Sequence, residues 1–155
     1  MQNSEALIVV LNDLVKINND RVAGYQRAIN ESNDLDVDMK ATFEGMIRES
    51  EQYKQELTAK IRQLGGHVET GTTTSGKIYR TWMDVKATFS GSDRKQILAS
   101  CEYGEDAARK AYESALASDA EMDAGVRQLI VAQQEALNNS HDHIKKYRDA
   151  HLAVS

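Results

Sequence analysis

The sequence predicts an all-α protein, a bundle of four long helices with one long crossover connection. The chain of 155 residues contains no proline, and proline is the residue that most strongly interrupts helices. Apolar residues recur at spacings of three and four over four long segments, which is the helical period. Runs of β-branched residues long enough for a strand are scarce. Helices with one apolar stripe must bury those stripes against each other, which favours an antiparallel bundle.

Capping and turn residues set the expected limits of the helices. Ser4 is a favoured N-cap and begins the first helix, which the turn residues of "NDLDVD" end. The second helix is expected at about Val37–Leu64, because two glycines follow it and glycine is the usual stop signal. The third is expected at about Arg94–Leu116 and the fourth at about Asp123–Ala150. A chain of this length forms one domain, here residues 1–155.

The connection between the second and third helices contains a stretch that looks like a nucleotide-binding loop. In "GTTTSGKI", residues 71–78, Gly71, Gly76 and Lys77 match the pattern G-x-x-x-x-G-K-[ST]. A true phosphate loop follows a β-strand, whereas a helix precedes this one, and Ile78 replaces the hydroxyl that holds Mg²⁺. We therefore expect no nucleotide at 71–78.

Glycine and threonine give residues 65–76 the composition of a flexible connector, and apolar spacing then predicts a short extra helix at about 77–89. Together the two segments are long enough to cross the length of the bundle. This length permits the second and third long helices to run parallel.

Composition narrows the classes of partner and compartment. The net charge of −5 disfavours nucleic acid and anionic membrane surfaces. No apolar stretch approaches the ~20 residues that span a bilayer. The single Cys101 cannot form an internal disulfide, which suits a reducing compartment. We expect a cytoplasmic protein.

Several polar residues fall at positions that the apolar stripes assign to the interior. Glu105 is the most informative, because a buried carboxylate is costly unless it is paired or bound to a metal. One explanation is a satisfied hydrogen-bond network. Another is a metal site, for which the candidate ligands are Asp20, Glu49, Tyr53, Glu102, Glu105 and His141.

The candidate ligands match a di-iron site poorly. Di-iron bundles supply a Glu from each of two helices and Glu-x-x-His from each of the other two. Here Tyr53 stands where a histidine could serve, and Asn138 supplies an amide three residues before His141. The set is short of anionic ligands for two cations. A structural polar core, one divalent metal and a di-iron centre all remain open, and no cofactor is required by the sequence.

Nearly the whole chain resembles a bacterial ferritin-like four-helix-bundle family of unknown function, distantly similar in fold to bacterioferritin and rubrerythrin. The resemblance is carried by "LNDLVKINNDRVAGYQRAINE", "RESEQYKQELTAKIRQLGG" and "GKIYRTWMDVKATFSGSDRKQILASCEYGEDAARKAYESAL", in which "WMD" and "CEYGED" are the most specific parts. It implies a ferritin-like fold with no established activity. It also implies shared acids at Asp20 and Glu49, a shared "GED" at 104–106, and a histidine in many members where Tyr53 stands.

Two functional hypotheses follow. The first is a non-enzymatic bundle that acts through association, as a homodimer or other homo-oligomer, in stress or envelope physiology. Its motivation is the incomplete ligand set together with the extra apolar residues Val9, Val10 and Ile17 of the first helix. The second is a metal-binding oxidoreductase with iron or another divalent metal at the candidate ligands. No hydrolytic catalytic set is visible in the sequence.

Overall fold

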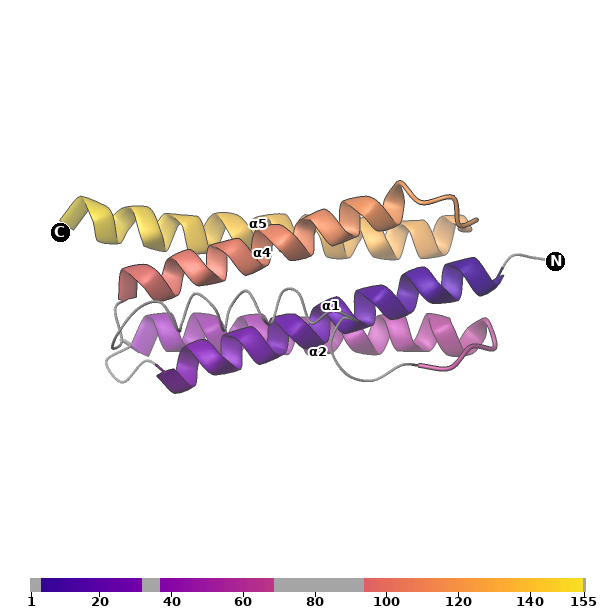
Figure 1. The fold of residues 1–155 in the computed structure, drawn as a ribbon, viewed down its shortest axis with the longest axis horizontal. Coiled ribbons are helices and arrows are strands. Elements are labelled where there is room, and N and C mark those ends of the chain that lie inside the picture. Colours follow the sequence, from indigo (N-terminus) through magenta and orange to yellow (C-terminus); the bar gives the residue numbers. More distant parts are fainter. Residues whose placement is uncertain (1–3, 32–36, 69–93, 155) are drawn as a thin grey trace.

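Four long helices form an elongated bundle in a computed structural model of the chain, which describes residues 4–31, 37–68 and 94–154 (Figure 1). The helices are α1 (Ser4–Glu31), α2 (Val37–Gln63), α4 (Arg94–Leu116) and α5 (Ala124–Val154). These limits confirm the four helices that the sequence predicts, although α5 continues beyond the predicted end. The short helix predicted at 77–89 and the connector from residue 69 onward lie outside the described residues.

The order and direction of the helices are those of a ferritin-like bundle. The chain runs along α1, returns along α2, crosses over, and then runs along α4 in the same direction as α2 before returning along α5 (Figure 1). Helix α1 packs against α2 and α4, α4 packs against α5, and α2 and α5 make the fewest contacts of the four neighbouring pairs. Among the described residues, α2 and α5 therefore pack least closely against each other.

Specific residues stop α2 and start α5. The Gly66 N–H donates to the Ile61 carbonyl at 2.9 Å and the Gly65 N–H to the Arg62 carbonyl at 3.0 Å. With a φ of 80° at Gly65, this is a Schellman cap. At the other helix, the Val126 N–H donates to Asp123 Oδ1 at 2.8 Å, so Asp123 is the N-cap and not the first helical residue.

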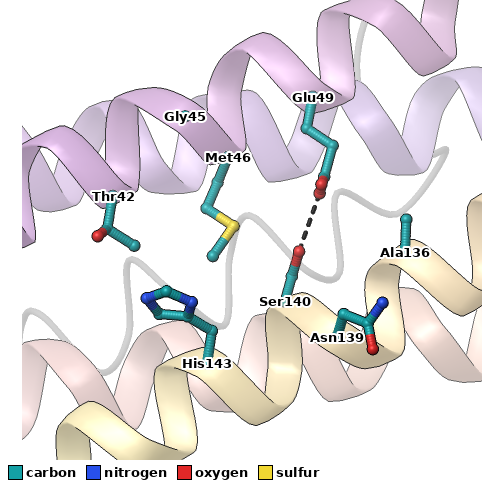
Figure 2. Close-up of a pocket in the computed structure, with 8 residues that line it drawn as sticks. All are labelled: Thr42, Gly45, Met46, Glu49, Ala136, Asn139, Ser140 and His143. Atoms are coloured by element: carbon teal, nitrogen blue, oxygen red, sulfur yellow. Dashed lines mark hydrogen bonds between the residues drawn. The ribbon is translucent and has the colours of Figure 1, made fainter.

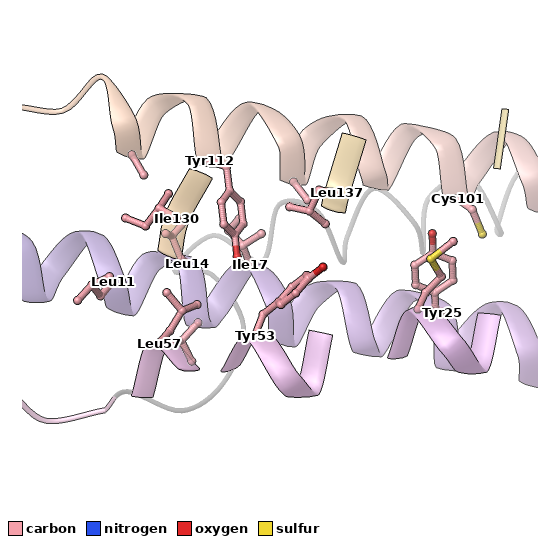
Figure 3. Packing of buried hydrophobic residues seen from close by; sticks show 14 of the residues in the cluster. Leu11, Leu14, Ile17, Tyr25, Tyr53, Leu57, Cys101, Tyr112, Ile130 and Leu137 are labelled. Atoms are coloured by element: carbon pink, nitrogen blue, oxygen red, sulfur yellow. The ribbon is translucent and has the colours of Figure 1, made fainter. Parts of the chain in front are cut away.

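The core runs the length of the bundle, as the apolar stripes predict (Figure 3). It includes Leu11, Leu14, Tyr25, Phe43, Leu57, Ile61, Leu98, Cys101, Tyr112, Ile130, Leu137 and Ile144. The association hypothesis rests on an extra apolar area formed by Val9, Val10 and Ile17. Ile17 is buried in the core and Val10 packs against the core, so of these three residues only Val9 is exposed, at 60%. Among the described helices, none is both long and apolar enough to cross a membrane.

Candidate functional site

A buried arginine organises the middle of the bundle. The Arg21 side chain of α1 is 1% exposed. Its Nε donates to Glu105 Oε1 at 2.7 Å and its Nη2 to Glu105 Oε2 at 2.8 Å, across to α4. This is the bidentate guanidinium–carboxylate geometry, the strongest form of charged hydrogen bonding available to arginine. The Glu105 side chain is fully buried, so the buried carboxylate predicted from the sequence is confirmed and its partner is a guanidinium.

The same guanidinium reaches α2 and, through it, α5. Arg21 Nη1 donates to Ser50 Oγ at 2.8 Å, and Nη2 donates to Glu49 Oε1 at 2.9 Å. Ser140 of α5 donates its hydroxyl to the same Glu49 oxygen at 2.9 Å. One arginine therefore links all four helices, and we call Arg21, Glu49, Ser50 and Glu105 the Arg21 centre.

Tyr25, one helical turn after Arg21, completes the hydrogen bonding of Glu105. Its hydroxyl donates to Glu105 Oε2 at 2.7 Å, and the Arg21 Cζ lies 5.6 Å from its ring centroid. Burial, and then the charge of Glu105, raise the pKa of Tyr25 well above its ordinary value. Burial by itself lowers the pKa of Arg21, but the charge and hydrogen bonds of Glu105, with Tyr25 and Glu49, outweigh burial and raise it. The guanidinium is therefore permanently charged.

A second buried polar group lies one turn along α1, and we call its three residues, Asn18, Tyr112 and Gln133, the Tyr112 layer. Asn18 Nδ2 donates to Tyr112 Oη at 2.8 Å, and the Tyr112 hydroxyl donates to Gln133 Oε1 at 2.6 Å. Gln133 Nε2 donates to Glu56 Oε1 at 3.0 Å, where the layer meets the half-buried rim. Burial raises the pKa of Tyr112. The three residues of the layer are uncharged.

The candidate metal ligands are divided among separate places. Glu49 and Glu105 converge, but on Arg21. Tyr53 is buried beside Glu49, and burial followed by the Glu49 charge raises its pKa. Glu102 Oε2 and His141 Nε2 lie 3.8 Å apart between α4 and α5, and His141 Nδ1 also lies 3.6 Å from Asp142 Oδ1. Asp20 is fully buried on α1. Within the described ranges, no three His, Cys, Asp or Glu residues group closely enough to hold a metal ion.

Sequence reasoning missed Arg21, although a signal for it exists. Leu14, Asn18, Arg21 and Tyr25 follow each other at spacings of four, three and four, so Arg21 falls on the same inward stripe as its buried neighbours. Gln133 of α5 is a second buried polar residue that the sequence did not single out.

A groove lies between α2 and α5, and Glu49 of the Arg21 centre is one of the residues that line it (Figure 2). It has a volume of about 420 Å³ and is lined by Thr42, Gly45, Met46, Glu49, Ala136, Asn139, Ser140 and His143. The Glu49 side chain is 30% exposed, in contrast to Arg21 and Glu105. The groove therefore gives solvent access to one carboxylate of the centre.

Comparison with solved structures places this architecture among ferritin-like bundles. One similar structure is described as "ferritin like, diiron-carboxylate proteins" from Bacillus anthracis str. Ames. It is 18% identical, with a TM-score of 0.66, over 94% of this chain and 95% of the other. At that identity the likeness establishes the fold alone.

Residues 6–118 match the family described as Domain of unknown function (DUF2383). The chain belongs to this family, which confirms the resemblance to ferritin-like bundles of unknown function. A search of the curated proteins finds no match to this chain.

Proposed function

We propose that this protein is a metal-independent ferritin-like bundle, in which Arg21 supplies the positive charge at the centre. It acts without catalysis, by association with another protein chain, and the first candidate for that chain is a second copy of the same protein. The observation that carries the proposal is the Arg21 guanidinium, which lies between the carboxylates of Glu49 and Glu105. Glu49 and Glu105 are the two candidate metal ligands that converge in the bundle, so a metal site there would need both.

The residues do not fit the pair of iron ions that the similar protein's description implies. Both oxygens of Glu105 already accept hydrogen bonds, two from Arg21 and one from Tyr25. A metal ion would have to break these bonds and also lie beside a guanidinium that does not lose its proton. Removing its partner would leave Arg21 as an uncompensated buried charge, which is strongly unfavourable.

Exposed apolar side chains support the association part of the proposal. Val9 on α1 and Tyr103 on α4 are the large apolar residues with high exposure among the described ones, at 60% and 58%. Burial of such side chains against a second copy removes apolar surface from water, which favours association.

Elemental analysis of protein purified from iron-supplemented cells tests the metal-independent part. We expect under ~0.1 metal per chain and no heat of binding when Fe²⁺ or Zn²⁺ is titrated in. Tightly bound metal near two ions per chain would overturn this part.

Sedimentation velocity tests the association part separately. We expect a dimer, which the substitutions Val9→Glu or Tyr103→Glu weaken because a charge cannot be buried at an apolar contact without cost. Glu113→Gln, an exposed change on α4, is the matched control. A wild-type protein that sediments as a monomer at all concentrations would contradict the association part of the proposal.

A further inference from the structure

The Arg21 centre has more negative than positive charge. Glu49 and Glu105 face a single guanidinium, and the ion pairs of both carboxylates are with Arg21. Among the described residues that line the α2–α5 groove, none is Lys or Arg, and His143 is the single basic side chain. Within the described part of the chain, the two carboxylates therefore outnumber the arginine of the centre by one charge, and Glu49 is the carboxylate that lines the groove.

Glu49 can accept a further hydrogen bond from a ligand. A carboxylate offers about four acceptor positions. Arg21 and Ser140 use two of them, both on Oε1. The acceptor positions that remain on Glu49 suit a compact, positively charged group that donates hydrogen bonds. Such a donor would gain more here than at the surface, because the carboxylate is only partly solvated.

The residues that line the groove limit the shape and polarity of the rest of such a ligand. Gly45, Met46 and Ala136 present small or apolar surface, and Thr42, Asn139 and His143 add polar side chains (Figure 2). At Gly45 an added Cβ would have the Arg48 side chain, 3.9 Å away, as its nearest neighbour, so the backbone itself is open there. A volume of about 420 Å³ accommodates a short aliphatic chain.

We propose that the α2–α5 groove binds a small aliphatic amine, with its ammonium group on the Glu49 carboxylate and its carbon chain against Met46 and Ala136. This site rests on the proposed function, because a metal ion held by Glu49 would consume the charge that attracts the amine. The amine binds and is not transformed. Its association adds a charge-assisted hydrogen bond to the link that Ser140 and Glu49 already make between α5 and α2.

Titration of the ¹⁵N-labelled full chain with n-butylammonium, followed by NMR, tests the site. We expect saturable shifts of the amides of Gly45, Ala136 and Asn139, and none of comparable size with n-butanol, which has the chain without the charge. Glu49→Gln should weaken n-butylammonium about tenfold, which is the loss of about 1.4 kcal/mol. Glu44→Gln, an exposed acid on the same helix, should leave the affinity unchanged.

Ala136→Leu fills the groove without touching the charge, and it should also weaken binding about tenfold. This variant keeps the test decisive if Glu49→Gln fails to fold. Absence of saturable shifts at millimolar n-butylammonium, or equal affinity in Ala136→Leu, would overturn the site. If that happens in protein shown to be free of metal, this inference fails while the proposed function stands; metal bound at Glu49 would overturn both.

Discussion

The Arg21 centre and the Tyr112 layer lie one helical turn apart in the same core, yet they differ in what holds them. The centre is ionic and links four helices through one guanidinium. The layer is a chain of neutral hydrogen bonds from Asn18 to Gln133. In a core of low dielectric, an orphaned charge costs far more than an orphaned amide. The difference teaches that the ionic centre is formed completely or not at all, whereas the neutral layer tolerates partial loss.

Removal of Glu105 should have the largest effect. Glu105→Leu leaves the buried Arg21 without its bidentate partner, and we expect a loss of about 3–5 kcal/mol in the free energy of unfolding. Urea unfolding at neutral pH measures it, and the double variant Arg21→Leu/Glu105→Leu should recover most of the loss. Glu113→Leu on the exposed face of α4 should change stability by less than about 0.5 kcal/mol. A cost below about 1 kcal/mol for Glu105→Leu would contradict the ionic account.

Loss of the Tyr112 hydroxyl should cost less. Tyr112→Phe leaves the Asn18 amide and the Gln133 carbonyl without their shared partner, and we expect a loss of about 2 kcal/mol by urea unfolding. Ser114→Ala, which removes an exposed hydroxyl from the same helix, is the control and should be nearly neutral. If Tyr112→Phe proves as damaging as Glu105→Leu, the distinction between the two regions is lost.

Alkaline pH should weaken both regions through their tyrosines. Burial raises the pKa of Tyr25 and Tyr112 in the folded protein, so above about pH 10 the unfolded chain binds fewer protons than the folded one. Stability is therefore fully present below pH 10 and falls as pH rises, by about 1.4 kcal/mol per tyrosine at pH 11. Unfolding between pH 9 and 11 should show a shallower decline in Tyr25→Phe. An unchanged slope would argue that Tyr25 is exposed to water.

Ion pairs on the surface of α4 should contribute least to stability, and they serve as a reference for the Arg21 centre and the Tyr112 layer. Asp106 pairs with Arg109 and Lys110 on its own helix, and the hydrogen bond from Arg109 lowers the pKa of Asp106. This contribution is present at neutral pH and is lost as pH falls through the lowered pKa. Asp106→Asn should cost only about 0.3–0.5 kcal/mol at neutral pH, since such helical pairs are screened by water. A loss above about 1 kcal/mol would show that surface and core pairs are not distinct here.

The fold was predictable because its signals are local. Ser4 and Asp123 are residues whose side chains favour the start of a helix, and the glycines after Leu64 favour its end. Apolar spacing predicts which face of each helix is buried. The burial of Glu105 followed from the same spacing. Its partner did not, because the pairing of Glu105 with Arg21 joins residues 84 positions apart. Such a pairing depends on the rotation and register of α1 against α4, which spacing within one helix does not determine.

The candidate metal ligands illustrate the same limit. The sequence correctly placed Glu49, Tyr53 and Asp20 near or in the interior, but side chains on one inward face can still point to different neighbours. Glu102 and His141 face each other on the α4–α5 side, apart from the Arg21 centre. Interior position was therefore predictable residue by residue, whereas convergence on one point was not.

A crystal structure of the protein grown with excess Fe²⁺, with anomalous data collected at the iron edge, tests the central claim most directly. We expect the Arg21 guanidinium in contact with both Glu49 and Glu105, and no anomalous peak between those carboxylates. Two strong peaks there, with Arg21 swung away from Glu105, would contradict it.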